Sequence, residues 1–403
     1  MERWDFGKDV ALSDRSLKRM TAWVALAALA WVGVASRTAV AQLDRLPAEI
    51  VGSTNALTPA QVTTVTVYVE AHSKNLGDAA KPQAIRADRL ELLQPLPEAG
   101  TPFRIKYGEL LGPKLLALVN DPGQTELVVI NALVIAGDLG TQQALDVLNL
   151  GAKSAKPAVR YQAAYGLLRT FETAAPNKTP AMRDDQFERA IAGTTERITN
   201  EKDPLVLDAL VRALLTAANN ERFRDRAVSV LSKSIGETVK SLAGNPGHKT
   251  LTEPQLDTLI RTTAGVRDIL TAANQRPVPA QVAKDAAELA GRLIAHMVKA
   301  VEGKQIAMLP PDPIRDRYSQ LATAAETVVV FSGTTLQPGG NFPNKDLGRT
   351  LKQATVQDDA KFALDGRTIA GSDGMLSKSP FNFPPDHFIP RYCLLYTSDA
   401  ADE

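Results

Sequence analysis

The sequence predicts an all-α protein built from antiparallel helix pairs stacked side by side. From about residue 57 to residue 336, alanine, leucine and valine recur at spacings of three and four residues, the period of an α-helix with one apolar face. Proline, glycine and asparagine interrupt this pattern at short intervals, so most helices expected in the N-terminal half are short. Longer, irregular helices are expected in the C-terminal half, followed by a poorly structured tail.

The composition excludes several classes of protein. The 403 residues include 46 Lys+Arg and 45 Asp+Glu, and this near neutrality argues against nucleic-acid binding, which requires a basic surface. A single cysteine excludes a disulfide framework and cysteine-based zinc or haem sites. We therefore expect no nucleic-acid partner and no cofactor.

Residues 1–41 resemble a secretory signal peptide. Lys18 and Arg19 precede an apolar run, and the small residues Ala39 and Ala41 lie where a signal peptidase would cleave. The run is shorter than the roughly 20 residues that a membrane-spanning helix needs. We expect an exported protein, periplasmic or extracellular, with no stable membrane span; an uncleaved N-terminal membrane anchor is the alternative.

The last segment, residues 393–403, resembles a translated sequencing adapter. It reads CLLYTSDAADE and is similar over its whole length to the adapter of a transposase-based library. On this interpretation residues 393–403 are an artefact, Cys393 is foreign to the protein, and the natural chain continues beyond Tyr392. All three tryptophans lie in the leader, so residues 42–392 contain neither cysteine nor tryptophan.

Residues 42–106 are expected to form N-terminal helices and a linker. One helix is predicted over residues 58–75, because Pro59 in the first turn lacks only an amide that the helix would not use. A second is predicted over residues 81–93 and ends before Pro95.

Residues 107–218 contain the clearest repeated pattern. Apolar stripes predict successive helices over residues 110–118, 125–137, 144–150 and 157–168. None of these helices is long enough to bury its stripe alone, whereas stacked antiparallel pairs would share one continuous core.

These helices resemble those of the HEAT-repeat family, in which the second helix of a pair begins at a proline turn and carries a Val-Arg pair and then small residues. The best match consists of Pro157, Val159, Arg160, Ala163, Ala164 and Leu167. A second consists of Val128, Ala132, Ala136, Gly137, Leu139 and Gly140, with Val129 where arginine is usual. A looser third consists of Asp203, Pro204, Val206, Leu210 and Leu214, with Leu207 at that position. The resemblance implies a HEAT-like α-solenoid in an exported bacterial protein, a weakened Asp–Arg ladder between repeats, and no catalytic residues.

The remaining segments are less regular. Residues 172–182 have the composition of a surface insertion. Residues 219–336, with helices predicted over 223–242, 253–274, 280–301 and 314–331, would form a long-helix bundle or the divergent end of the solenoid.

Residues 337–392, rich in Gly, Pro, Asn and Asp, are predicted to be an irregular tail. A few aromatic side chains, Phe381, Phe383 and Phe388, would dock on the rest of the protein. The alternative is a small hairpin on the turn Asp365-Gly366, which would be marginal without a partner surface.

No convergent catalytic set stands out. The histidines His72, His248, His296 and His387 are too far apart in sequence to form a helical metal pair, and His296 is expected in the core. Residues 244–250 resemble a phosphate-binding loop, but His248 separates its last glycine from the lysine and a helix precedes it. We therefore name no catalytic, cofactor-binding or metal-binding residue.

Clusters of charge have ordinary explanations in the sequence. Asp184 and Asp185 would open a helix, where carboxylates offset the positive end of the helix dipole. Asp358 and Asp359 are expected to be solvated in the tail. The arginines Arg222, Arg224 and Arg226, interleaved with acids, predict a charged helix face, and a site for an anionic partner is the alternative. Asn177 fits a glycosylation sequon.

The function predicted from these observations is that of an exported, non-enzymatic scaffold or protein-binding protein. Stacked helices present an extended surface on which binding needs no short motif. The alternative is an envelope enzyme acting on a polysaccharide or peptide in a helical groove, with acid and base residues from separate helices. A third possibility places the function in a region beyond Tyr392.

Overall fold

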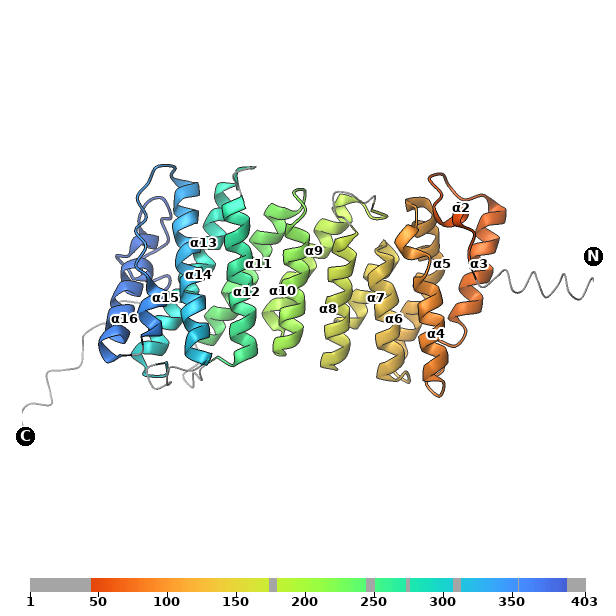
Figure 1. Cartoon of the computed structure of the whole chain (residues 1–403), viewed down its shortest axis with the longest axis horizontal. Helices are drawn as coiled ribbons and strands as arrows, with labels where there is room; N and C mark the ends of the chain where they lie inside the picture. Colours follow the sequence, from red (N-terminus) through yellow and green to blue (C-terminus); the bar gives the residue numbers. More distant parts are fainter. Residues whose placement is uncertain are drawn as a thin grey trace, which may run out of the picture.

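The protein is all-helical, as the sequence predicts (Figure 1). The computed structural model describes residues 45–173, 180–243, 251–272, 276–306, 313–353 and 355–389. Within these ranges there is no strand, although an isolated bridge joins Gly371 to Ile389. The α-helices are α2 Ala48–Val51, α3 Pro59–Ser73, α4 Pro82–Leu93, α5 Thr101–Asn120, α6 Glu126–Leu139, α7 Gln142–Gly151, α8 Pro157–Glu172, α9 Asp184–Asn200, α10 Pro204–Ala218, α11 Arg224–Ala243, α12 Glu253–Thr271, α13 Ala280–Glu302, α14 Pro313–Leu336, α15 Leu347–Lys352 and α16 Val356–Ala370. Two short 3-10 helices, η2 Leu96–Glu98 and η4 Met375–Ser377, complete the described structure.

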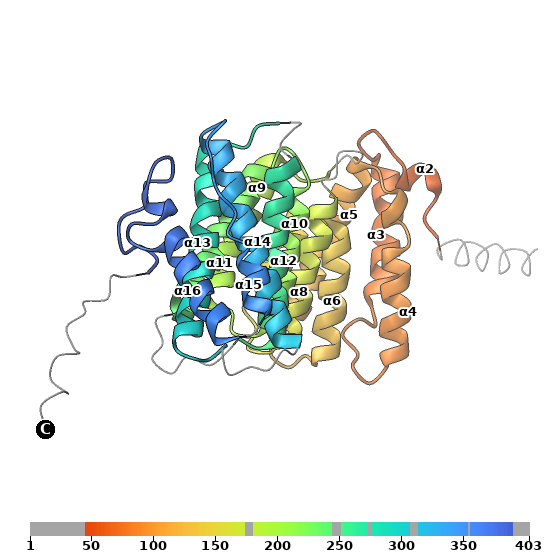
Figure 2. The same ribbon diagram turned by 60° about the vertical axis from the view of Figure 1, so that its left-hand side comes forward.

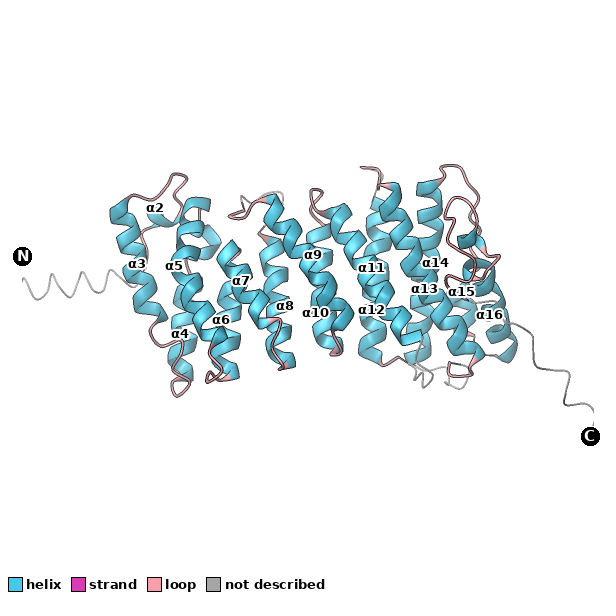
Figure 3. Cartoon of the chain, turned by 180° about the vertical axis from the view of Figure 1, so that it is seen from behind, coloured by secondary structure: helices cyan, strands magenta, loops and turns pink. Residues whose placement is uncertain are grey.

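The helices lie side by side in two layers. In the first layer α4, α6, α8, α10, α12 and α14 each contact the next helix. The second layer consists of α5, α7, α9, α11, α13 and α16, of which α7 and α9 do not pack closely together. The connections run along the two long edges of the layers (Figure 3). The described N-terminal helices lie at one end of the row and α16 at the other, as Figures 1 and 2 show.

Several helix starts follow from local capping. The Thr58 hydroxyl accepts the amide of Gln61 at 3.4 Å, and the Gln61 side chain accepts the amide of Thr58 at 2.8 Å. Thr252 and Gln255 form the same reciprocal pair at the start of α12. Such caps satisfy amides that the first turn leaves without partners. The starts predicted near residues 58 and 252 are therefore confirmed.

The closest approach between helices of the first layer joins α6 to α8. A Cβ atom built on Gly137 would lie 2.7 Å from the Cα atom of Gly166. A Cβ atom on Gly166 would lie 2.4 Å from a methyl carbon of Leu148 on α7. Two glycines thus let three helices meet at a distance that larger residues would prevent, in agreement with the small residues expected there.

We predict that Gly137→Ala destabilises the protein. The added methyl group would meet backbone and not a movable side chain, so the strain of about 1–3 kcal/mol should exceed the gain of up to about 1 kcal/mol that alanine brings to a helix. Urea denaturation measures the change. The matched control is Gly193→Ala in α9, where a Cβ would meet nothing within 4 Å; it should stabilise the protein by about 0.5–1 kcal/mol. Equal effects of the two variants would contradict the packing argument.

The prediction of an irregular, poorly structured tail over residues 337–392 is wrong. This segment contains α15 and α16, and it packs against α13 and α14. The alternative hairpin is also wrong, because Asp365 and Gly366 lie inside α16. Gly366 faces α13, where an added Cβ would lie 2.4 Å from Val298. The docking of the three aromatics is confirmed, since Phe381, Phe383 and Phe388 are all buried.

Asp359 was expected in solvent, and this expectation is also wrong. Its carboxylate is buried and accepts a hydrogen bond from the guanidinium of Arg315 on α14, which is itself 1% exposed. Arg315 also donates to the carbonyl oxygens of Leu351 at 2.8 Å and Ile306 at 3.0 Å. This buried ion pair fastens α16 and the end of α15 to the long helix α14.

We predict that Asp359→Asn loses about 3–5 kcal/mol of stability, because a buried guanidinium would lose its countercharge. The neighbouring variant Asp358→Asn is the control. Asp358 is half-buried in the first turn of α16, and its carboxylate accepts a hydrogen bond from the Thr355 hydroxyl that an amide oxygen can also accept, so removing its charge should cost less than about 1 kcal/mol. Chemical denaturation of both variants decides the matter; a loss below about 1 kcal/mol for Asp359→Asn would count against a stabilising role for the buried pair.

The remaining expectations concern the long helices, one domain boundary and the segments that lie outside the described residues. The long helices of the C-terminal half are confirmed: α11, α12, α13 and α14 have 20, 19, 23 and 24 residues. The helix expected over residues 110–118 begins earlier, at Thr101, so the boundary placed between residues 106 and 107 falls inside α5. The leader at residues 1–41, the adapter-like residues 393–403, the sequon at Asn177 and the segment 244–250 with His248 all lie outside the described residues.

Candidate functional site

The outer face of the first layer carries an apolar strip on its N-terminal half. On α6 and α8, side chains three or four residues apart point away from the second layer and share one face. Six of them are exposed or half-buried large apolar residues on these two helices, and Leu90 on α4 continues the row at 52% exposed. We call this set the α4–α8 strip; it consists of Leu90, Leu127, Ile130, Val134, Tyr161, Tyr165 and Leu168.

The exposure of the two tyrosines gives the strip its character. Tyr161 and Tyr165 lie one turn apart on α8 and are 42% and 43% exposed. Leu127 on the adjacent α6 is 43% exposed. Tyrosine is enriched in the centres of protein interfaces because it combines a large apolar ring with a hydroxyl group. Contiguous exposed apolar residues of this kind mark interaction surfaces more often than single exposed leucines do.

The same face becomes charged from α10 onward. Asp208 on α10 accepts hydrogen bonds from Arg212 on the same helix at 2.6 Å and from Arg261 on α12 at 2.8 Å. Arg317 on α14 in turn pairs with Asp257 on α12 at 2.7 Å. Ion pairs thus bridge neighbouring helices beyond α8. On α10 the single residue Leu205, one turn before Asp208, is still 62% exposed, so the contiguous apolar row ends at α8 although an isolated apolar side chain follows it.

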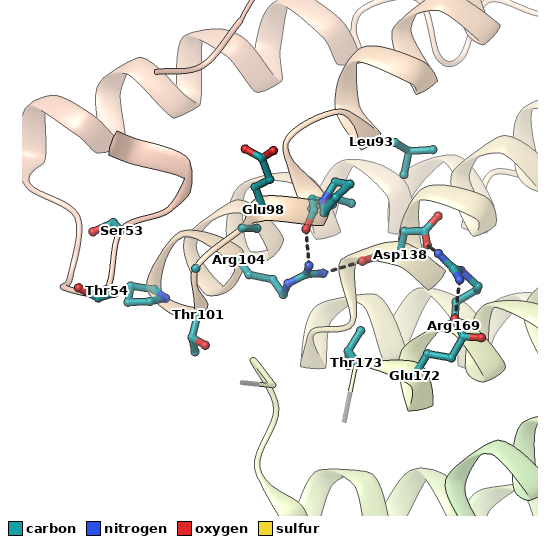
Figure 4. Close-up of a pocket in the computed structure, with 15 residues that line it drawn as sticks. Ser53, Thr54, Leu93, Glu98, Thr101, Arg104, Asp138, Arg169, Glu172 and Thr173 are labelled. Atoms are coloured by element: carbon teal, nitrogen blue, oxygen red, sulfur yellow. Dashed lines mark hydrogen bonds and ion pairs between the residues drawn. The ribbon is translucent and has the colours of Figure 1, made fainter. Parts of the chain in front are cut away.

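A pocket of about 730 Å³ lies at the end of the strip (Figure 4). Its walls come from the loop after α2, the segment between α4 and α5, and the C-terminal ends of α6 and α8. Asp138 and Arg169, which line it, continue the outward rows of Val134 and Tyr165 by one turn. The pocket and the strip therefore form one continuous surface, apolar along the helices and polar at their ends.

Arg104 builds the floor of this pocket. Its guanidinium donates to the carbonyl oxygens of Asp138 at 2.7 Å and Leu139 at 2.9 Å, and to that of Leu96 at 2.6 Å. Figure 4 shows the side chain reaching from α5 toward Asp138. Burial lowers the pKa of Arg104, and the charge of Asp138 partly offsets this effect. The guanidinium of Arg104 lies at the C-terminal end of α6, where the carbonyl oxygens concentrate negative potential. Its hydrogen bonds join α6 to the segment after α4.

Two of the three carboxylates in the pocket form ion pairs with a second arginine. Arg169 on α8 donates to Asp138 at 2.8 Å and also pairs with Glu172 on its own helix. Burial opposes the charge of Arg169, yet the hydrogen bond and charge of Asp138 raise its pKa overall. Each of these two carboxylates is therefore held by a cation of the chain itself.

We predict that Arg104→Met destabilises the protein by about 2–4 kcal/mol, because buried carbonyl oxygens would lose their donors. Hydrogen exchange should show that the segment between α4 and α5 opens more readily. Lys106→Met is the control on the same helix. The Lys106 side chain is 36% exposed and, among the described residues, forms an ion pair only with Glu109, so its loss should stay within about 0.5 kcal/mol. The role assigned to Arg104 would be wrong if both variants unfolded at the same urea concentration.

The residues singled out from sequence are scattered. His72 lies in the last turn of α3, and His296 is 3% exposed on α13, as expected for a core residue. His387 lies 3.0 Å from Glu288 and stacks on Phe383, far from the strip in the row of helices.

The charged helix face expected at Arg222, Arg224 and Arg226 forms only in part, because Arg222 precedes α11. Arg222 pairs with Asp184 at the start of α9, and Arg224 is buried beside Asp225, whereas Arg226 is exposed. The opening of α9 at Asp184 and Asp185 is confirmed.

Sequence reasoning missed the α4–α8 strip. The signal was present, because Tyr161 and Tyr165 are apolar residues at outward positions of a helix whose inward positions, including Ala163 and Ala164, already form its core stripe. Two apolar faces on one helix indicate either a second packing partner or an exposed binding surface.

Two searches of the described residues found nothing further. No group of three or more His, Cys, Asp or Glu side chains within the described ranges could hold a metal ion. None of the helices that the structure describes is both long and apolar enough to cross a membrane.

Comparison with known proteins does not assign a family. No family model matches the chain, and no curated protein matches it. Among solved structures, that of human deoxyhypusine hydroxylase in complex with glycerol is similar at 17% sequence identity, over 58% of this chain and 98% of that one, with a TM-score of 0.20. A likeness of this size has no bearing on function.

Proposed function

We propose that the protein is an exported, non-enzymatic scaffold that binds a protein partner through the α4–α8 strip. The leader-like residues 1–41 support export, and the HEAT-like pattern over residues 107–218 supports a solenoid whose repeats present one side of each helix pair. The observation that carries the proposal is the bounded row of exposed apolar residues on α4, α6 and α8, centred on Tyr161 and Tyr165.

The strip suits a partner with an apolar segment and polar flanks. Tyr161, Tyr165 and Leu127 together offer rings and a branched chain at about half exposure, which leaves area to bury without first unfolding the helix. At about 25 cal/mol per Å² of buried apolar surface, a few such side chains supply most of the favourable energy of a protein interface. The polar pocket at Asp138 and Arg169 provides the rim in which hydrogen bonds would set the register.

The alternative of an envelope enzyme lacks a comparable observation. It would need acid and base groups converging in an open cleft. His296 is buried in α13, and two of the three carboxylates of the pocket, Asp138 and Glu172, are engaged by Arg169. The third, Glu98, is exposed, and no described histidine lies in the lining to act with it. The proposal therefore rests on the binding class.

Affinity capture from a native envelope extract tests the proposal. We expect the wild-type chain to retain one or more specific proteins and the double variant Tyr161→Ser/Tyr165→Ser to lose them. Leu364→Ser on α16 is the control, since Leu364 is 64% exposed but lies at the other end of the row; it should capture the same proteins as the wild type. Thermal unfolding of all three chains verifies that each is folded.

Two outcomes would overturn the proposal. Capture of no specific protein by the wild type is one, and retention of the same proteins by the tyrosine variant is the other. Light scattering adds a direct check on the partner: a wild-type dimer that the tyrosine variant abolishes would identify a second copy of this chain as the occupant of the strip and replace the scaffold proposal.

A further inference from the structure

A second pocket, of about 690 Å³, lies in the other layer, between α7 and α9. It exists because these two helices do not pack closely, although α5 contacts α7 and α9 contacts α11. Helix α7 has only ten residues, and Gly193 on α9 is exposed with open space where a side chain would be. The start of α8 and the turn between α9 and α10 complete the walls.

Basic residues dominate the lining. Five cationic side chains come from four different segments of the chain, against two carboxylates, Glu196 and Glu201. The cations are Lys153, Arg160, Arg189, Arg197 and Lys202. Convergence from α7, α8, α9 and the following turn distinguishes this pocket from a charged face of a single helix, whose side chains would spread into solvent.

One of the two carboxylates, Glu201, already accepts several hydrogen bonds from its neighbours. Glu201 accepts two hydrogen bonds from Arg160 at 2.8 Å and two from the amides of Lys202 and Asp203 at 2.9 Å. Burial opposes ionisation, but the donors from Arg160 and the backbone keep the pKa of Glu201 below its usual value. Oε1 accepts three of these four bonds and Oε2 accepts the fourth, so the neighbours of Glu201 already take most of its acceptor capacity.

Three cations of the pocket lack such a partner. Within the described chain, no carboxylate forms an ion pair with Lys153, Arg197 or Lys202, whereas Arg189 pairs with Asp185 at 2.8 Å. Arg197 is half-buried, and its guanidinium donates to the amide oxygen of Asn149 on α7. Burial lowers the pKa of Arg197, and only the neighbouring charge of Glu196 opposes this effect. A partly buried guanidinium held by a neutral amide favours the arrival of an anion.

We propose that this pocket binds a small organic anion with at least two negative charges, carried by phosphate or carboxylate groups. Arg197 contacts the anion through the side of the guanidinium that Asn149 leaves open, and Lys153 and Lys202 contact it from the two ends of the groove. The volume falls within the range of about 300–1,000 Å³ that small-molecule sites occupy. The site lies in the opposite layer from the α4–α8 strip and is independent of the function proposed there.

Thermal unfolding of the full chain with inorganic pyrophosphate, citrate or sodium chloride at one ionic strength tests the site. We expect a saturable rise in Tm with pyrophosphate or citrate and none with chloride, and the stronger of the two identifies the charged group. Lys153→Gln/Lys202→Gln should weaken the apparent affinity about tenfold, the effect of losing about 1.4 kcal/mol of binding energy. Arg197→Gln should weaken it at least as much.

Arg267→Gln on α12 is the control, because it removes one cation outside the pocket, and it should leave the affinity unchanged. The lysine double variant decides the question even if Arg197→Gln fails to fold, since both lysines are exposed. Multivalent anions also stabilise proteins by exclusion from their surface. A rise in Tm that does not saturate, or that is equal in all variants, overturns the proposal. Binding of poly-glutamate without binding of either small anion overturns it too, in favour of an acidic protein segment.

Discussion

The contact that the candidate site depends on is the approach of α6 to α8 through Gly137 and Gly166. Each of these helices has only 14 or 16 residues and an apolar face too small to be stable alone, so it persists only while its neighbours cover that face. The two glycines bring the helix axes close enough for the outward rows of both helices to lie edge to edge. Arg169 can then reach from α8 to Asp138 on α6, and the strip and pocket become one surface.

The first layer holds its helices together in two different ways. Between α6 and α8 the backbones themselves touch, and the outward side chains are apolar except at the C-terminal ends, where Arg169 pairs with Asp138. From α10 to α14 the helices are bridged on the same face by ion pairs such as Asp208 with Arg261. Exposed pairs of this kind contribute roughly 0.2–1 kcal/mol each, so they add little stability and mainly keep the face hydrated. Along most of the apolar half of the face, such ion pairs neither add stability nor keep the surface hydrated. A partner protein that covers the exposed apolar side chains is the simplest explanation for their presence.

Local signals explain what could be predicted from the sequence. Capping by Thr58 and Thr252 involves residues three positions apart, so it is visible in the sequence. The errors concern contacts between distant residues. Gly366 follows Asp365 as in a hairpin turn, yet it is a helical glycine against α13. Asp359 looks solvated until Arg315, 44 residues earlier, folds onto it.

Proline shows the same limit. Pro95 ends a helix as predicted, whereas Pro113 lies within α5. A proline ends a helix when nothing else holds the chain in helical form, and in α5 the buried residues Leu111 and Leu115 on either side hold it against the core. The candidate site was missed for a related reason: a pattern of apolar residues cannot say which of two apolar faces will be covered.

The arginine that the HEAT-like pattern placed at residue 160 does find an acidic partner in the next helix pair, but the partner is Glu201 and not an aspartate. This substitution matters for the neighbouring pocket. Glu201 accepts hydrogen bonds from Arg160 and from the amides of the turn before α10. Its charge is therefore engaged within the contact between successive helix pairs. Arg197, four residues earlier on α9, is left with the amide of Asn149. The ion pair between Arg160 and Glu201 links successive helix pairs, and it leaves Arg197 beside the open groove with no carboxylate partner among the described residues. The positive charge of Arg197 is therefore what makes the groove suited to an anion.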